Sequence, residues 1–128
     1  MIPLRVAVQG FMSYRDEAEL VFTGAPLWVL AGRNGSGKSA IFDAITYALY
    51  GIHRAGSQNA KALIHHASSA LSIEFDFSIG DDAYRVKRTL GRRSTGTVQA
   101  FRLEPDEAVP IAETETKVGF DRWVLAQD

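Results

Sequence analysis

The feature that most constrains this chain is the motif at residues 32–39, which reads Gly-Arg-Asn-Gly-Ser-Gly-Lys-Ser. It fits the pattern G-x-x-x-x-G-K-[ST], in which glycines let the backbone curl so that successive N–H groups point at a phosphate. Lys38 offers a compact positive charge, and the Ser39 hydroxyl is a hard oxygen ligand suited to Mg²⁺. This phosphate loop predicts a nucleoside triphosphate site; the alternative is a glycine-rich turn with an incidental lysine.

The segments on either side of the phosphate loop favour the first interpretation. Residues 27–31 form an uninterrupted apolar run, which is typical of a strand buried on both faces. Residues 40–50 contain only Asp43 and Thr46 as polar residues and are followed by Gly51, a typical helix stop. We therefore predict a buried helix whose N-terminal amides and dipole face the phosphates.

The rest of the chain predicts an antiparallel meander. A first strand carries Leu4, Val6 and Val8, and a second covers residues 17–22. Residues 51–69 are polar, with 56–59 as the most loop-like part and 61–64 as a short helical turn. Residues 71–79 alternate strictly, so one face is core and the other, with Ser72, Glu74, Asp76 and Ser78, faces solvent.

The meander continues to the end of the chain. On the returning strand, Tyr84, Val86 and Leu90 are expected to face inward, with residues 85, 87 and 89 outward. A third strand is predicted at 97–103 and a short one at 108–111. Thr114 is a candidate cap for a final helix, whose apolar residues are Val118, Phe120, Trp123, Val124 and Leu125.

This order of elements separates fold classes. Kinases and small GTPases usually start with the loop and continue in β-α alternation, whereas here two strands precede the loop and a meander follows the helix. The order predicts an α/β P-loop NTPase, specifically the N-terminal, ATP-binding lobe of an ABC-type ATPase head. We expect one domain over residues 1–128, a mixed sheet with an antiparallel meander around the buried helix.

Composition and charge limit the partners and the cellular location that we expect for this chain. The formal net charge of −1 and pI of about 6.3 show no global basic balance, so any nucleic-acid contact has to be local. The absence of cysteine excludes disulfides and thiolate metal sites. No apolar run approaches a membrane span and no leader is apparent. We expect a soluble cytoplasmic protein without a membrane partner.

Three stretches, at residues 8–14, 32–39 and 41–51, resemble the N-terminal head segment of SbcC-type ATPases. The same segment is similar in the archaeal and eukaryotic double-strand-break repair ATPases and, more distantly, in SMC proteins. The resemblance implies ATP and Mg²⁺ as cofactors and a DNA-associated protein. Its expected partners are a C-terminal lobe of the same protein, a second head in an ATP-dependent homodimer, an SbcD-type nuclease and DNA.

The resemblance also implies roles for single residues. Asn34 matches the position that approaches the γ-phosphate, Lys38 the catalytic phosphate lysine, and Ser39 the Mg²⁺ ligand. The remaining expected nucleotide contacts come from the backbone, at Gly35, Ser36, Gly37 and Ala40. Residues 61–64 are similar to the part beside the adenine. The repair ATPases often carry a phosphate-contacting arginine where this chain has Met12, and Arg15 is a possible substitute.

The family pattern contains parts that residues 1–128 do not show. No glutamine after Trp123 stands in the expected Gln-Gly setting, although Gln127 lies nearby, and no coiled-coil heptads, acidic Walker B strand or signature motif appear. We therefore expect ATP binding with poor hydrolysis by these residues alone. The alternatives are the nucleotide-binding domain of an ABC transporter and a non-catalytic, ATP-gated interaction module.

Other polar residues carry weaker hypotheses. A metal site at His53, His65 and His66 lacks a useful ligand spacing. The acidic pairs at 17 and 19 and at 81 and 82 are better explained as solvated charge. Several members of a basic set are expected to gather on one sheet face and turn, either as a solvated face or as a contact for DNA phosphates. The set comprises Arg85, Lys87, Arg88, Arg92, Arg93 and Arg102.

Overall fold

The computed structural model describes residues 1–22, 38–52 and 57–127, with the backbone alone at residues 38, 39 and 57–59. Its described strands form one sheet in the order β2-β1-β3-β4-β5-β6, in which every pair is antiparallel. The strands are β1 (Ile2–Gln9), β2 (Ala18–Val21), β3 (Ala70–Ile79), β4 (Asp82–Gly91), β5 (Thr97–Leu103) and β6 (Ala108–Pro110). The predicted strand at 27–31, which would make the sheet mixed, lies outside the described residues.

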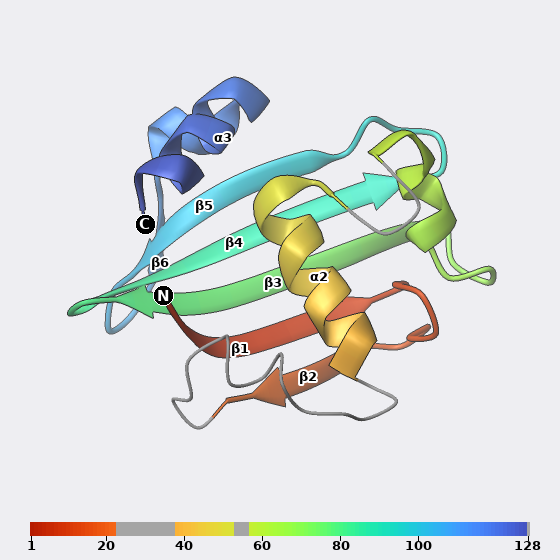
Figure 1. Ribbon diagram of the computed structural model, residues 1–128, viewed down its shortest axis with the longest axis horizontal. Coiled ribbons are helices and arrows are strands. Elements are labelled where there is room, and N and C mark those ends of the chain that lie inside the picture. Colours follow the sequence, from red (N-terminus) through yellow and green to blue (C-terminus); the bar gives the residue numbers. More distant parts are fainter. Residues whose placement is uncertain (23–37, 53–56, 128) are drawn as a thin grey trace.

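Helix α2 (Lys38–Tyr50) lies across one face of this sheet, over β1, β3 and β4 (Figure 1). The helix and its end are confirmed, because Gly51 takes a φ of 68° directly after Tyr50. Its second half supplies the buried residues Ala44, Ile45, Tyr47, Ala48 and Leu49, whereas residues 40–43 are only half-buried. The predicted all-round burial therefore holds only in part: it is nearly complete for residues 44–49, and Tyr50 at the end of the helix is exposed.

The core lies between α2 and the sheet, and it is made by the alternation that the sequence predicted. Leu71, Ile73, Phe75 and Phe77 of β3 are buried beside Val86 of β4. Helix α3 (Lys117–Ala126) extends this core at the β5 end, where the Trp123 ring lies 5.4 Å from that of Tyr84. The meander and the final helix are thus confirmed.

The cap of α3 differs from the prediction. Thr116, not Thr114, caps the helix, and its hydroxyl accepts a hydrogen bond from Gly119 N at 3.0 Å. Thr114 lies in the short 3-10 helix η2 (Ala112–Glu115) and is fully buried. Its hydroxyl meets the edge of β5, where Ala100 N donates to it at 3.0 Å, and Ile111 N donates to Ala100 O. A buried hydroxyl needs hydrogen-bond partners, and Thr114 finds them on β5, so it does not cap α3.

The segment after α2 also differs in part. Residues 57–59, expected to be the most loop-like, begin the 3-10 helix η1 (Ser57–Leu63), and the predicted turn at 61–64 falls at its end. Leu63 and Ile64 are buried, and Met12 N donates to Leu63 O at 2.6 Å. Packing against the turn after β1 orders a sequence that has little helical signal of its own.

On the outer face of the sheet, the prediction that Asp76 faces solvent is wrong, because Asp76 is only 5% exposed. Register places Arg5 and Arg85 opposite it on the two neighbouring strands. Arg85 donates to both carboxylate oxygens, at 2.8 and 3.0 Å, and Arg5 Nη1 lies 3.5 Å from the second. The hydrogen bond to Asp76 raises the pKa of Arg85. Two arginines thus cover one carboxylate on a nominally solvent-facing surface.

The turn after β1 requires glycine at its first position. Gly10 has a φ of 65°, and a Cβ there would overlap the carbonyl oxygen of Ala70 on β3. Gly10 N donates to Arg15 O, and His65 N donates to Gly10 O, so this residue joins three segments. Gly80, in the β3–β4 turn, has a similar φ of 61° with no described atom near the equivalent Cβ position.

We predict that Asp76→Asn lowers the free energy of unfolding by about 1–3 kcal/mol, because two partly buried guanidinium groups lose their shared charge partner. Chemical denaturation measures this change. Glu104→Gln is the control: it removes the exposed partner of Arg102 and should cost less than about 0.5 kcal/mol. Equal effects of the two substitutions would contradict the prediction.

We predict that Gly10→Ala destabilises the fold more than Gly80→Ala does. Both place alanine at a positive φ, which costs about 1 kcal/mol. Only Gly10→Ala also forces Ala70 and the turn apart, which adds about 1–3 kcal/mol. Paired thermal unfolding curves would test this, and similar midpoints for the two variants would show that the Ala70 contact is unimportant.

Candidate functional site

The structure places only part of the predicted nucleotide site. Asn34, Gly35, Ser36 and Gly37 lie outside the described residues. Lys38 and Ser39 are described by backbone alone, as the first two residues of α2, and Ala40 follows half-buried in the same turn. The predicted ligands of ATP and Mg²⁺ thus lead into the N-terminal end of α2, where free amides and the helix dipole favour an anion.

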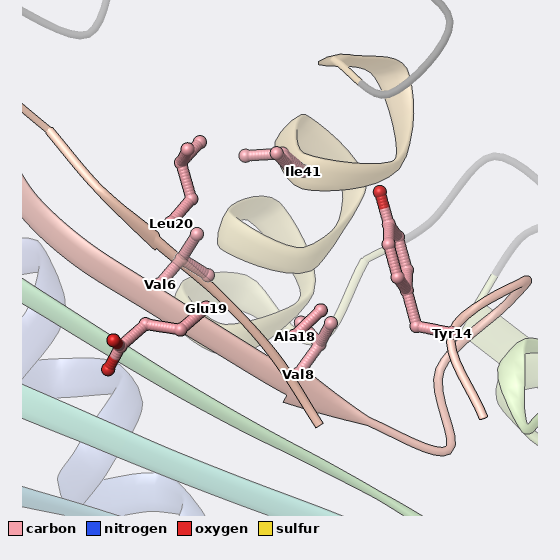
Figure 2. A pocket seen from close by; sticks show the side chains of 7 residues that line it. All are labelled: Val6, Val8, Tyr14, Ala18, Glu19, Leu20 and Ile41. Atoms are coloured by element: carbon pink, nitrogen blue, oxygen red, sulfur yellow. The ribbon is translucent and has the colours of Figure 1, made fainter. Parts of the chain in front are cut away.

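A cavity of about 190 Å³ lies beside this end of α2, between the helix and strands β1 and β2. Ile41, from the first turn of α2, projects toward Leu20 of β2, whereas the carboxylate of Glu19 points away from the helix (Figure 2). The other lining residues are Val6, Val8, Tyr14 and Ala18. The walls are mainly apolar, so the cavity suits the flat face of an organic ring better than a phosphate group.

The turn of residues 10–16 contributes Tyr14 to this cavity. Phe11 N donates to Tyr14 O at 2.9 Å, and Tyr14 N donates to Phe11 O at 2.8 Å, which closes the turn. Met12 has a φ of 51°, rare for a residue with a side chain. Such outliers occur often at binding sites, where the surrounding structure enforces them. Met12 N also contacts Leu63, which brings the segment expected beside the adenine next to this turn.

Arg15 belongs to a different cavity from Tyr14. It is exposed and lines a cavity with Gln9, Gly10 and residues 67–72, whereas the cavity beside α2 takes Tyr14 from the same turn. The hypothesis that Arg15 replaces the arginine missing at Met12 stays a prediction, and this placement does not favour it.

Arg88 lies at the opposite end of α2, and the sequence reasoning misplaced it. It belongs to the basic set of which several members are expected to share one sheet face and turn, yet it is 8% exposed and lies on the core face. Its Nε donates to Ala48 O at 3.1 Å, and its guanidinium carbon lies 5.4 Å from the ring centres of both Tyr47 and Phe120. Burial lowers the pKa of this guanidinium, while Tyr47 and Asp121 act the other way. The sequence does contain a signal for this position: residue 88 alternates with the inward-facing residues 84, 86 and 90 of the same strand, which predicts an inward side chain.

The other members of the basic set are also dispersed. Arg85 binds Asp76 on the outer face, Lys87 lies near Glu74 there, and Arg102 pairs with Glu104. Arg92 and Arg93 are exposed in the β4–β5 turn. The expected gathering on one sheet face and turn therefore holds for Arg85 and Lys87 and for the two turn arginines, whereas strand alternation sends Arg88 to the opposite face. Carboxylates pair with three of the others.

The remaining polar candidates form no site in the described part of the chain. His65 and His66 stack at 4.2 Å, and His65 Nδ1 accepts a hydrogen bond from Ala67 N at 3.0 Å. His53 lies outside the described residues, among which no group of three His, Asp or Glu side chains could hold a metal. Glu19 pairs with Arg5, and Asp82 begins β4. No described helix is both long and apolar enough to cross a bilayer.

Comparison with known proteins identifies the family of this chain. The AAA domain family matches residues 5–120. The SbcC subunit of the SbcCD nuclease from Deinococcus radiodurans is 41% identical over 108 residues, which cover 83% of this chain and 12% of that protein. The Bacillus subtilis protein of the same name is 35% identical over 128 residues, with 92% and 11% coverage. The probable DNA double-strand break repair Rad50 ATPase of Aquifex aeolicus is 40% identical over 90 residues, with 69% and 9% coverage.

A solved structure supports the fold. The SMC head domain from Thermotoga maritima superposes with a TM-score of 0.53 at 23% identity, over 87% of this chain and 39% of that chain. The chain spans only about a tenth of the curated relatives it matches. By sequence and fold, the chain belongs to the AAA domain family, as a P-loop relative of the SbcC and Rad50 ATPases that has the fold of an SMC head.

Proposed function

We propose that this chain binds Mg²⁺·ATP as the N-terminal lobe of an SbcC-like or Rad50-like ATPase head. The observation that carries the proposal is an intact phosphate-loop motif leading directly into α2, whose far half is buried against the sheet. A helix fixed in this way gives its N-terminal amides a constant position, which an anion site requires.

Each predicted residue has a role in this proposal. The amides of Gly35, Ser36, Gly37 and Ala40 bind phosphate oxygens, and Lys38 neutralises charge at the β- and γ-phosphates. Ser39 supplies one oxygen to Mg²⁺, and the Asn34 side chain lies by the γ-phosphate. The apolar cavity beside Ile41 is a candidate position for the adenine or ribose.

The activity of the whole head depends on sequence beyond these residues. We propose that a C-terminal lobe completes the site and that two heads engage when ATP is bound. Hydrolysis then releases them and controls an SbcD-type nuclease on DNA. The names of the relatives, a nuclease subunit and repair ATPases, support this proposal over a transporter domain. A non-catalytic module remains the alternative if ATP binds without being hydrolysed by the completed head.

A local basic surface supports a contact with DNA. We define the basic end as Lys61, Arg92 and Arg93, at the end of the sheet near η1. Lys61 Nζ donates to Arg92 O at 2.6 Å, and Arg92 donates to the carbonyls of Ser68 and His65 at 2.9 Å each. These three side chains are exposed, so their charges can reach phosphates although the chain is slightly acidic overall.

We predict saturable binding of Mg²⁺·ATP by the wild-type chain and a reduction of at least about tenfold in affinity for Lys38→Ala, since a charge-assisted hydrogen bond is worth about 1.5–3 kcal/mol. Isothermal titration with and without Mg²⁺ measures the effects of the metal and of the lysine. Lys87→Ala, on the outer face, is the control and should bind as the wild type does. Equal affinity of all three proteins would exclude the phosphate loop as the site.

We predict that duplex DNA binds with an affinity that falls steeply with salt. Arg93→Gln should reduce the slope of log K against log salt by about one for each phosphate that the side chain neutralises. Arg93 is chosen because Arg92 also holds the 65–68 segment. Arg102→Gln, an exposed arginine paired with Glu104, is the matched control. An unchanged slope for Arg93→Gln would remove the basic end from the proposed DNA interface.

A further inference from the structure

The proposed function leaves one buried charge of the core without a role. Asp76 and Arg88 are the buried charged residues of the described chain, and Arg88 is the one on the core face of the sheet. Asp76 has two guanidinium partners, whereas Arg88 Nη2 has no hydrogen-bond partner among the described residues. Burial of a cation with an incomplete set of hydrogen bonds costs free energy. An apolar side chain would avoid this cost, so packing alone does not account for an arginine here.

Arg88 contacts the C-terminal end of α2 through a directional hydrogen bond. Its Nε donates to Ala48 O at 3.1 Å, and its guanidinium carbon lies 5.4 Å from the centre of the Tyr47 ring. A Cβ at Gly51 would lie 3.4 Å from Arg88 Nη1, so the guanidinium lies against the residue that ends the helix. The last carbonyls of a helix lack donors within the helix, and a cation is favoured beside them. Arg88 therefore holds α2 by its last turn.

The same guanidinium also contacts α3. The centre of the buried Phe120 ring lies 5.4 Å from the guanidinium carbon, and Asp121 interacts electrostatically with the same group. A cation between two aromatic rings is attracted to both of their faces, which limits where it can lie. One side chain of β4 thus contacts both helices that cover this part of the sheet.

Apolar packing does not by itself fix the position of the other end of α2. Residues 44–49 are nearly all buried, whereas residues 40–43, which follow the phosphate loop, are half-buried. Burial of apolar surface has no preferred direction and tolerates a small slide or rotation of a helix, but a binding site needs its groups held within about 0.5 Å. A hydrogen bond to one backbone carbonyl has a preferred direction and length, so it selects one position of α2 along the sheet.

We propose that Arg88 is a positioning residue for the nucleotide site. By fixing the last turn of α2 against β4 and α3, it sets the position of the first turn of the same helix, where the phosphate loop ends. The intrahelical hydrogen bonds make the 13 residues of α2 move as a unit, so a shift at Ala48 reaches Lys38 and Ser39. This inference rests on the proposed function, because it assumes that the nucleotide binds at the N-terminal end of α2. Arg88 acts through the helix and not by contact with the nucleotide.

The test compares the wild-type chain with Arg88→Met and with a control, Ile79→Ala. Ile79 is a half-buried residue at the end of β3 that packs against the core, so its truncation destabilises the fold without removing a contact of Arg88. Mg²⁺·ATP affinity is measured by calorimetry at a temperature at which all the proteins are folded, and the amide NMR signals of residues 40–43 are recorded without nucleotide. Arg88→Met should weaken binding about threefold to tenfold and shift these signals. Ile79→Ala should change neither.

A conservative variant keeps the test decisive. Arg88→Lys retains a charged donor without the planar fork, so its affinity should lie between those of the wild type and Arg88→Met, and it replaces Arg88→Met if that variant does not fold. The inference is overturned if the variant leaves both the affinity and the amide signals unchanged, or if Ile79→Ala weakens binding as much. Failure of the wild-type chain to bind Mg²⁺·ATP would instead overturn the proposed function, and the amide signals would still show whether Arg88 positions α2.

Discussion

The fold depends on the burial of one half of α2 against one face of the antiparallel sheet. Ala44, Ile45 and Ala48 enter a core whose floor is Phe75, Phe77 and Val86. Small residues on the helix let it approach the large side chains of the strands, so removal of apolar surface from water fixes its position. Residues 40–43, in the other half of the helix, are only half-buried, and Lys38 lies at its start. In the proposed function, the half of the helix that is packed most tightly is therefore not the half that binds the ligand.

Local patterns were sufficient to predict most of the elements. Three local patterns agree with the structure that tertiary contacts stabilise. They are the strand alternation of residues 71–79, the apolar helical segment 40–50 and the helix end at Gly51. Resemblance added the family, because a phosphate loop alone belongs to many proteins. The roles predicted for residues 34–37, and for the side chains of 38 and 39, stay predictions.

The structure differs from the sequence predictions where a contact with a residue distant in sequence determines which side chain is buried or caps a helix. Asp76 is buried because strand register sets arginines on both sides of it, and no local pattern contains that information. Thr114 is buried because the edge of β5 needs a partner, which leaves Thr116 as the cap. Arg88 is the exception, since its alternation was visible and only its charge argued for an outward position. A buried charge is uncommon unless the interior supplies compensating contacts.

Thr114 and Ile111 have an effect beyond the local packing of η2. They occupy the N–H and C=O of Ala100 on the margin of β5, just where the three-residue β6 ends. An edge strand pairs with a strand of another molecule through its free backbone N–H and C=O groups. Because those of Ala100 are already hydrogen-bonded, intermolecular strand pairing is blocked at this point of the edge. One buried hydroxyl thereby acts as a safeguard against aggregation for a protein whose core strands are rich in Phe, Ile and Val.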